Sequence, residues 1–344
     1  MKNISYKLII LFVCMVFLCL ASYSLAFAYG QDFKTTAQSA IVMERSSKRV
    51  LYSKNCNVGL PIASTTKIVT ALTVLNNSNL DDIVEIPAEA CGIEGSSIYL
   101  RAGEHLTVRE LLYGLMLRSG NDAAVALALH TAGSVEKFAD MMNETATNLK
   151  LNNCHFANPH GLHDDNHYCS ANDLAILTCE ALNNSDFCEI VACKSYRISN
   201  EGYDYDRVLV NKNKLLTNCD GADGVKTGYT KKAGKCFVGS ATRKGMQVVV
   251  VVLNCGPMFE ETADMLDAAY ANYNLKTVVP QNKVCGMLEH KGVETYYVCP
   301  ERIQYPLKDG EDVNVEIELN KDIQRLIVSL DGKVVCEKQL VPVV

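Results

Sequence analysis

The chain has none of the features that mark a nucleic-acid-binding protein, and after its first residues it has none that mark a membrane-spanning one. Its 344 residues carry a formal charge of −6 and contain no basic stripe, so no nucleic acid is expected as a partner. No apolar run beyond residue 28 is long enough to cross a bilayer, and VVVVVL at 248–253 is typical of a short buried strand. Internal repeats and low-complexity segments are also absent, which leaves a globular chain of ordinary composition.

The cysteines lack the spacing of a disulfide or redox framework. The sequence has 15 cysteines and no C-x-x-C motif. Many cysteines in an exported chain normally suggest disulfides. Here the number left after an N-terminal signal is odd, the spacing is irregular, and the chain is large enough to fold without cross-links. We therefore expect mostly free, buried thiols.

The first 28 residues have the layout of an export signal. Lys2 and Lys7 precede an uncharged apolar run at 8–20, and Ala26 and Ala28 suit a signal peptidase. We predict a signal peptide over 1–28, and a mature protein exported to the cell envelope, either secreted or on the outer face of the cytoplasmic membrane. The alternative is an uncleaved N-terminus that keeps the protein at the membrane, because residues 8–28 are long enough to span it.

Apolar periodicity predicts an α+β fold. A hairpin is expected at 39–55, and a second hairpin turns at 243–245 between period-two segments. Thr107 and Glu110 form a capping-box pattern, and Ser170 is a predicted helix cap. The sheet would carry a helical insertion, followed by a small all-β appendage with no helices. Helices are expected at 64–75, 107–118, 121–133, 134–149, 170–182 and 257–273.

The stretch ASTTKIVTAL places Ser64 three residues before Lys67 at a predicted helix start. Residues three apart lie on one helix face, so the lysine amine can reach the serine oxygen. A serine hydroxyl is a weak nucleophile until a base takes its proton. A lysine can act as that base only when neutral, so its pKa must fall from about 10.4 towards roughly 7–8. Taken alone, S-x-x-K is a common pattern, and an ordinary surface lysine explains it as well.

Two further motifs have the same ambiguity. Ser119 and Asn121 follow one apolar helix and precede another; the serine can relay a proton and the asparagine can bind an amide, or the pair can merely cap helices. Lys226 and Thr227 suit a carboxylate, and Gly228 allows a peptide backbone to approach, unless the segment is only a turn.

Together and in this order, S-x-x-K, S-x-N and K-T-G form the active-site set of penicillin-binding proteins and serine β-lactamases. The chain resembles the low-molecular-mass penicillin-binding proteins that are serine-type D-alanyl-D-alanine carboxypeptidases, of the sporulation-associated type. The likeness covers about 33–277 and implies a β-lactamase/transpeptidase-like domain; residues 278–344 resemble the small C-terminal β domain more loosely. It is carried by IASTTKIVTAL, LMLRSGNDAAVALA, ANPHGLHDDNHY and GADGVKTGYTKKAGKCFVGSATR.

The resemblance implies three catalytic residues. Ser64 would attack the carbonyl of the penultimate D-alanine of a peptidoglycan stem pentapeptide, with Lys67 as base. Ser119 would relay the proton to the leaving amine, and water would release the shortened peptide. No cofactor or metal is implied, and β-lactam antibiotics would acylate Ser64 in the manner of the substrate.

The resemblance also implies the substrate-binding residues. Asn121 would orient the substrate amide, Lys226 would tune the local field, and Thr227 would bind the terminal carboxylate. Gly228 would lie beside the bound peptide, and the backbone N–H of Tyr229 would join that of the nucleophile in an oxyanion hole.

Other interpretations stay open at this point. A β-lactamase often deacylates through a glutamate in E-x-x-L-N, and the nearest stretch here, from Glu180 to Asn183, is one residue short. A non-catalytic penicillin-binding cell-wall protein would retain the same motifs.

Lys212 lies where some relatives carry an arginine near the substrate carboxylate, although a surface lysine is the simpler interpretation. Zinc is the remaining alternative, but no common zinc spacing fits the candidate ligands His155, His160, His163, His167, Cys154 and Cys169.

Overall fold

The computed structural model describes residues 32–199, 206–290 and 293–343. The predicted signal peptide, 1–28, lies outside these residues. Within them, no helix is both long enough and apolar enough to cross a membrane.

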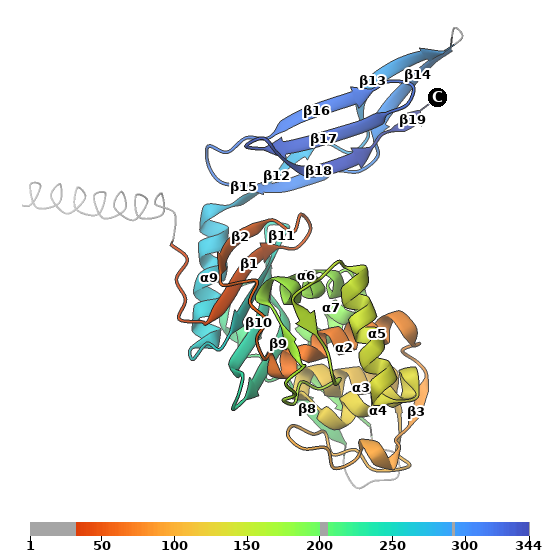
Figure 1. Ribbon diagram of the computed structural model, residues 1–344, viewed down its shortest axis with the longest axis vertical. Helices are drawn as coiled ribbons and strands as arrows, with labels where there is room; N and C mark the ends of the chain where they lie inside the picture. Colours follow the sequence, from red (N-terminus) through yellow and green to blue (C-terminus); the bar gives the residue numbers. More distant parts are fainter. Residues whose placement is uncertain (1–31, 200–205, 291–292, 344) are drawn as a thin grey trace, which may run out of the picture.

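The centre of the molecule is a five-stranded antiparallel sheet in the order β2-β1-β11-β10-β9 (Figure 1). Both hairpins predicted from the sequence are present, and β1 pairs with β11, so the two ends of this unit close one sheet around the helices inserted between them. The strands span Ser39–Glu44 (β1), Val50–Lys54 (β2), Ala222–Thr230 (β9), Gly234–Arg243 (β10) and Met246–Leu253 (β11).

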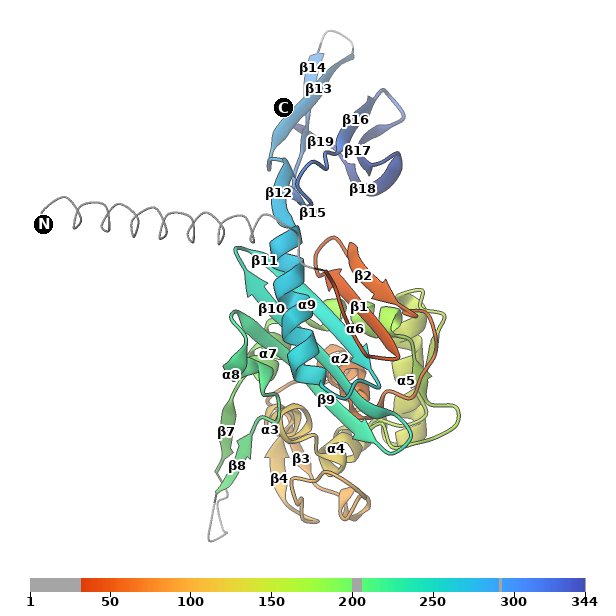
Figure 2. The ribbon, with the colours of Figure 1, turned by 90° about the vertical axis from the view of Figure 1, so that its left-hand side faces the viewer.

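Strand β11 is buried on both faces because helices cover both sides of the sheet. Val248, Val250 and their neighbour at 252 pack with helix α9, Met258–Asn272, whereas Val249 and Val251 face the other helices. This explains why VVVVVL reads as a continuous apolar run rather than an alternating one. Figure 2 shows α9 lying across this face of the sheet.

Most of the remaining helices form a subdomain on the opposite face, as the α+β prediction requires, whereas Leu215 of the short helix α8, Leu215–Asn218, packs on the α9 side. The capping box of Thr107 and Glu110 is present, and the Ser170 hydroxyl caps its helix by accepting from the Asp173 amide. The helices span Lys67–Asn77 (α2), Val108–Tyr113 (α3), Asn121–Ala132 (α4), Val135–Asn148 (α5), Ala171–Ala181 (α6), Ser185–Ala192 (α7) and Leu215–Asn218 (α8). The short strands of this region are Ile83–Glu85 (β3), His105–Thr107 (β4), Cys154–His155 (β5), Tyr168–Cys169 (β6), Ser195–Ile198 (β7) and Arg207–Val210 (β8).

Two of the predicted helices differ from the structure, one at its start and one in its second half. Residues Ala63–Thr66 form a 3₁₀ turn, and α2 begins only at Lys67. The predicted helix from 107 ends as α3 at Tyr113 and continues as a π-helical turn over Gly114–Arg118. Apolar spacing cannot distinguish these tighter and wider turns from an α-helix, because the same side chains face the core in each.

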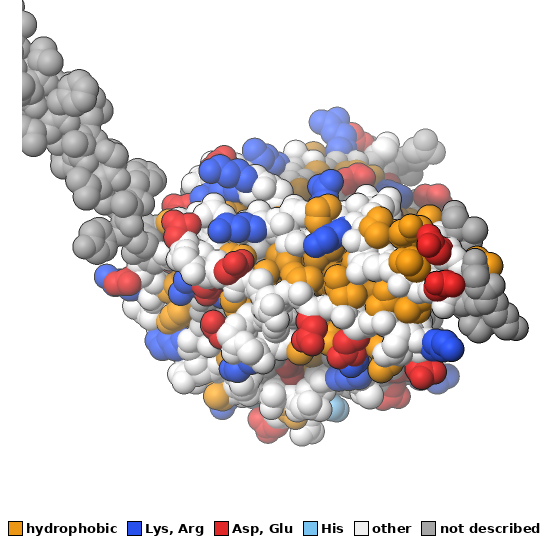
Figure 3. Space-filling model, turned by 90° about the horizontal axis from the view of Figure 1, so that it is seen from above, with side chains coloured by type: hydrophobic (Ala, Val, Ile, Leu, Met, Phe, Trp, Pro, Cys, Tyr) orange, Lys and Arg blue, Asp and Glu red, His pale blue; other side chains and the backbone are white. Residues whose placement is uncertain are grey.

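The C-terminal part consists of strands alone. They span Asn274–Val279 (β12), Lys283–His290 (β13), Val293–Cys299 (β14), Ile303–Leu307 (β15), Asn314–Leu319 (β16), Gln324–Leu330 (β17), Lys333–Gln339 (β18) and Val341–Val343 (β19). Met287, Tyr296 and Val343 are exposed register partners across β13, β14 and β19. Figure 3 views the molecule from the end that carries the C-terminal strands and shows apolar side chains gathered among charged ones.

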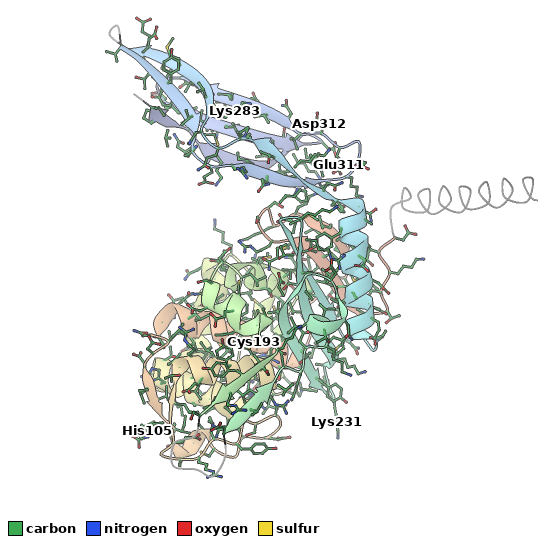
Figure 4. All side chains as sticks on the ribbon, turned by 180° about the vertical axis from the view of Figure 1, so that it is seen from behind. His105, Cys193, Lys231, Lys283, Glu311 and Asp312 are labelled. Carbon is green, nitrogen blue, oxygen red and sulfur yellow. The ribbon has the colours of Figure 1, made fainter. Side chains whose placement is uncertain are left out.

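A largely buried ion pair joins the C-terminal strands to the central sheet. Arg49, just before β2, contacts Glu311 through both guanidinium nitrogens at 2.9 and 2.8 Å. The guanidinium also lies over the rings of Tyr273 and Tyr305. Figure 4 places Glu311 at the junction above α9, so this contact holds the C-terminal strands against the body of the molecule.

Candidate active site

Ser64 and Lys67 lie in direct contact at the junction of the 3₁₀ turn and α2. The Lys67 Nζ lies 3.0 Å from the Ser64 Oγ, 2.7 Å from the Asn121 Oδ1 and 2.7 Å from the His160 carbonyl oxygen. The lysine side chain is fully buried, and the serine is half-buried. The S-x-x-K and S-x-N motifs therefore meet at the Lys67 amine.

This environment favours the neutral form of Lys67. Burial lowers its pKa well below the ordinary value, the charges of Lys226 and Lys212 lower it further, and only Asp122 acts in the opposite direction. A neutral amine has two hydrogens, which the Asn121 and His160 oxygens can accept. Its lone pair is then directed to the Ser64 hydroxyl, which is the arrangement that a general base requires.

The third motif lies within strand β9, so the alternative of a simple turn is wrong. Lys226 is fully buried, and its Nζ donates to the Thr227 carbonyl at 2.9 Å. Burial and the charge of Lys212 lower the Lys226 pKa to about 7. A Cβ on Gly228 would lie 3.0 Å from the backbone nitrogens of Ser64 and Thr65, so the glycine allows the strand to approach the 3₁₀ turn that carries Ser64.

The Ser119 segment is both a helix boundary and part of the site. Ser119 adopts left-handed backbone angles, φ 64° and ψ 35°, at the end of the π-helical turn, and Gly120 is the N-cap of α4. Asn121, the first residue of α4, donates from its Nδ2 to the Glu94 carbonyl at 2.6 Å, which directs its Oδ1 to Lys67. The segment is therefore a helix boundary, as the capping interpretation predicts, and its Asn121 also contacts Lys67.

Two of the predicted substrate-binding residues, Thr227 and Tyr229, have less defined surroundings. Thr227 is half-buried on β9, and the Tyr229 side chain is 66% exposed. Lys212 is exposed, as a surface lysine would be, but its Nζ donates to the Ser96 hydroxyl at 2.9 Å and its charge reaches both buried lysines.

The loop between β5 and β6 supplies contacts that the motifs did not indicate. Besides the His160 carbonyl, the loop provides His167, whose Nδ1 accepts from the Ala157 amide and whose Nε2 lies 2.7 Å from the Thr66 hydroxyl. Burial lowers the pKa of His160 to about 3 and that of His167 to about 4, so both are neutral at pH 7. The stretch ANPHGLHDDNHY was the signal, but its carbonyl contact could not be read from side-chain types.

The histidines of this loop are engaged within it. His155 Nδ1 lies 2.6 Å from the Asn166 carbonyl, and His160 Nδ1 accepts from the Leu162 amide. No group of three or more His, Cys, Asp or Glu side chains arranged for a metal ion occurs in the described part of the chain.

Gly161 is expected to tolerate no side chain. Its φ is +83°, and a Cβ there would lie 2.0 Å from the carbonyl oxygen of Ala63, the residue directly before Ser64. We predict that Gly161→Ala destabilises the protein by roughly 3 kcal/mol or more and slows acylation of Ser64, because this backbone contact cannot relax cheaply. Thermal melting and penicillin labelling measure the two effects.

The matched control is Gly103→Ala. Gly103 has a similar φ of +76°, but nothing lies within 4 Å of its Cβ position. This variant isolates the cost of left-handed backbone angles, about 1 kcal/mol. Equal losses in the two variants would contradict the steric argument.

Comparison with solved structures identifies the fold. The crystal structure of the Streptomyces K15 DD-transpeptidase matches 71% of this chain and 100% of its own, with a TM-score of 0.66 and 34% identity. The D-alanyl-D-alanine carboxypeptidase DacD of Francisella tularensis, at 23% identity, shares the fold over 92% of this chain and 95% of its own, with a TM-score of 0.71. The fold and the paired motifs define a protein of the penicillin-binding class.

Sequence comparison narrows this class. A family model described as D-alanyl-D-alanine carboxypeptidase, peptidase S11, matches residues 26–256. The D-alanyl-D-alanine carboxypeptidase DacF of Bacillus subtilis (strain 168) is 34% identical over 337 residues, covering 89% of this chain and 86% of its own. The chain belongs to the D-alanyl-D-alanine carboxypeptidase family.

Proposed function

We propose that the protein is a serine-type D-alanyl-D-alanine carboxypeptidase that removes the terminal D-alanine from peptidoglycan stem pentapeptides through an acyl-enzyme on Ser64. The observation that carries the proposal is the 3.0 Å contact between the Lys67 Nζ and the Ser64 Oγ, in surroundings that favour the neutral amine. β-lactam antibiotics, which present a strained amide and a carboxylate, would acylate the same oxygen.

In the first half of the reaction the Ser64 Oγ attacks the carbonyl carbon of the penultimate residue. Its proton passes to the Lys67 Nζ, which the Asn121 and His160 oxygens hold in place. The carbonyl oxygen becomes an oxyanion that accepts from the backbone N–H groups of Ser64 and Tyr229. The close approach of β9 to the nucleophile turn at Gly228 supports this assignment.

In the second half the carbon–nitrogen bond breaks. Ser119 relays a proton to the leaving amine of D-alanine, Thr227 binds its carboxylate, and Lys226 supplies positive potential when protonated. Asn121 contributes to holding the substrate amide. Water then attacks the acyl-enzyme carbonyl and releases the shortened peptide and the free Ser64 hydroxyl. Apart from the substrate and this water, every group named in these steps belongs to the protein, and no cofactor or metal is proposed.

The test is D-alanine release from a muropeptide pentapeptide by the purified protein. We expect release from the peptide that ends in D-alanyl-D-alanine and almost none from the same peptide ending in L-alanine. Prior treatment with benzylpenicillin should abolish release, because both reagents use Ser64. A protein that takes up penicillin yet releases no D-alanine would instead be the non-catalytic cell-wall protein.

A β-lactamase is the second candidate. Glu180 lies in the last turn of α6, and its carboxylate accepts from the Asn183 side chain at 3.2 Å. Within the described part of the chain, the hydrogen bonds of Ser64 and Lys67 involve no carboxylate that could activate water. We therefore expect a long-lived penicilloyl-enzyme, and penicillin turnover at many per second would favour the β-lactamase.

The organisation and location of the chain are further parts of the proposal. The peptidase domain covers 33–277, and the small β domain covers 278–344. Because its wall substrate lies outside the cytoplasmic membrane, the protein requires the export that residues 1–28 predict; their retention would leave it on the membrane. The similarity to DacF supports a sporulation-associated role.

The rate of penicillin acylation is expected to fall as the pH is lowered, because protonation of Lys67 removes the base. The charge of Lys212 lowers the pKa of both Lys67 and Lys226, so Lys212→Gln raises both values. The acid limb of the pH–rate profile should therefore move to higher pH in this variant. Stopped-flow acylation across the pH range measures it, and Lys231→Gln, on an exposed turn lysine, is the control. If the acid limb stayed in place in Lys212→Gln, as it should in the control, the proposed effect of the Lys212 charge on Lys67 would be wrong.

A further inference from the structure

The loop that carries His160 begins and ends at two cysteines that face each other across a strand pair. Cys154 in β5 and Cys169 in β6 are register partners. The Ser170 amide donates to the Asn153 carbonyl at 2.8 Å, so the cysteines form a non-hydrogen-bonded pair of the antiparallel ladder. In such pairs the side chains are closest and the Cα atoms lie about 4.5 Å apart, within the range that a disulfide spans.

The two thiols belong to directly opposite residues but differ in exposure. After burial, the neighbouring Cys154 thiol is the next cause that raises the pKa of Cys169, and the Cys169 Sγ donates to the Ser170 carbonyl at 3.4 Å. Cys169 is fully buried, whereas Cys154 is half-buried and can meet a reagent. Among the strand pairs of residues 32–199, 206–290 and 293–343, no other register partners are both cysteines. The pair therefore combines an accessible thiol with a resolving thiol.

We infer that Cys154 and Cys169 are a redox-modifiable pair that forms a reversible disulfide at the base of the active-site loop. The Cys154 thiolate attacks a small-molecule disulfide, forming a mixed disulfide and expelling one thiolate. The Cys169 sulfur then attacks the Cys154 sulfur and expels the second thiolate. The two protein thiols lose two electrons and two protons, and the reagent disulfide gains them as two thiols.

Burial controls the order of these steps. It raises the pKa of the Cys169 thiol well above the ordinary value, so this thiol is a poor first nucleophile. Once the reagent is attached to Cys154, the directly opposite position of Cys169 makes the second step intramolecular.

The disulfide would close a loop whose backbone contacts Lys67, the proposed catalytic base. The enclosed segment contains the His160 carbonyl that accepts from Lys67, and His167, which contacts Thr66. Closing a loop of this length restricts the unfolded chain. We expect the oxidised protein to melt roughly 5 °C or more above the reduced protein.

The experiment treats the purified full-length protein with oxidised glutathione and maps peptides without reduction. We expect a cross-linked peptide pair that contains Cys154 and Cys169 and lacks two hydrogen atoms, reversed by dithiothreitol. Cys169→Ser should instead accumulate glutathione on Cys154, and Cys154→Ser should carry none at Cys169. Cys56→Ser, at another half-buried cysteine, should still form the disulfide.

Two results would overturn the inference. One is a glutathione adduct that persists on Cys154 in the unaltered protein; the other is cross-linking of different cysteines in place of this pair. Because the unaltered chain gives both readouts, neither depends on whether a serine variant folds.

Discussion

Ser64→Ala should release D-alanine from a pentapeptide at a rate lower by roughly 10⁴-fold or more and should form no penicilloyl-enzyme. The reason is chemical, because no other atom in the Lys67 contact set can form the acyl bond. Removing the nucleophile of a catalytic group that works as a unit abolishes covalent catalysis and leaves only the residual effect of binding and oxyanion stabilisation. Intact-protein mass spectrometry after penicillin treatment and a D-alanine assay measure both losses.

The structure predicts that this substitution leaves the fold unchanged. The Ser64 Oγ makes a 3.0 Å contact with Lys67 and only a marginal 3.5 Å contact with the His160 carbonyl, so little packing is lost. Ser46→Ala, at an exposed serine in the β1–β2 turn, is the matched control and should retain full activity. If Ser64→Ala still became acylated at an active-site hydroxyl, the assignment of the nucleophile would be wrong.

Lys67→Met is expected to have the second-largest effect, a loss of roughly 10³- to 10⁴-fold in the acylation rate. The substitution keeps the length and burial of the side chain but removes the lone pair that takes the Ser64 proton. General-base catalysis contributes about 10²- to 10⁴-fold, and the lysine also orders the serine oxygen. Pre-steady-state acylation by a chromogenic β-lactam measures the change directly.

The control for this variant separates chemistry from folding. Two buried oxygens, on Asn121 and His160, lose their hydrogen-bond donor, so a moderate fall in the melting temperature is expected. Lys231→Met, at an exposed lysine after β9, should change neither rate nor stability. An acylation rate within tenfold of the unaltered protein would show that another group is the base, with Lys226 the first to test by the same substitution.

The fold could be predicted to a large extent because its signals are local. The hairpins, the capping box at Thr107 and the Ser170 cap depend on neighbours along the chain, and each is present. The β5–β6 and β7–β8 pairs were not predicted, since strands of two to four residues carry too little periodicity to stand out.

The candidate site, like the fold, was predicted where its signals are local along the chain and was not predicted where distant segments meet. Helical spacing brings Ser64 within reach of Lys67 through local geometry alone, although the helix proper begins one turn later than predicted. The His160 carbonyl and the backbone contact at Gly161 could not be predicted, because a backbone oxygen has no residue type and a steric contact needs two distant segments.

By itself, the sequence determined which groups are available for chemistry: a hydroxyl and an amine one turn apart, an amide near a helix start, and a second amine ahead of a hairpin. Only the tertiary structure decided the charge state of the amines. The pKa of Lys67 and that of Lys226 are lowered by burial and by other positive charges, and both depend on segments far apart in the chain meeting in a water-poor interior. Spacing along a chain places atoms near one another, but desolvation is a property of everything packed around them.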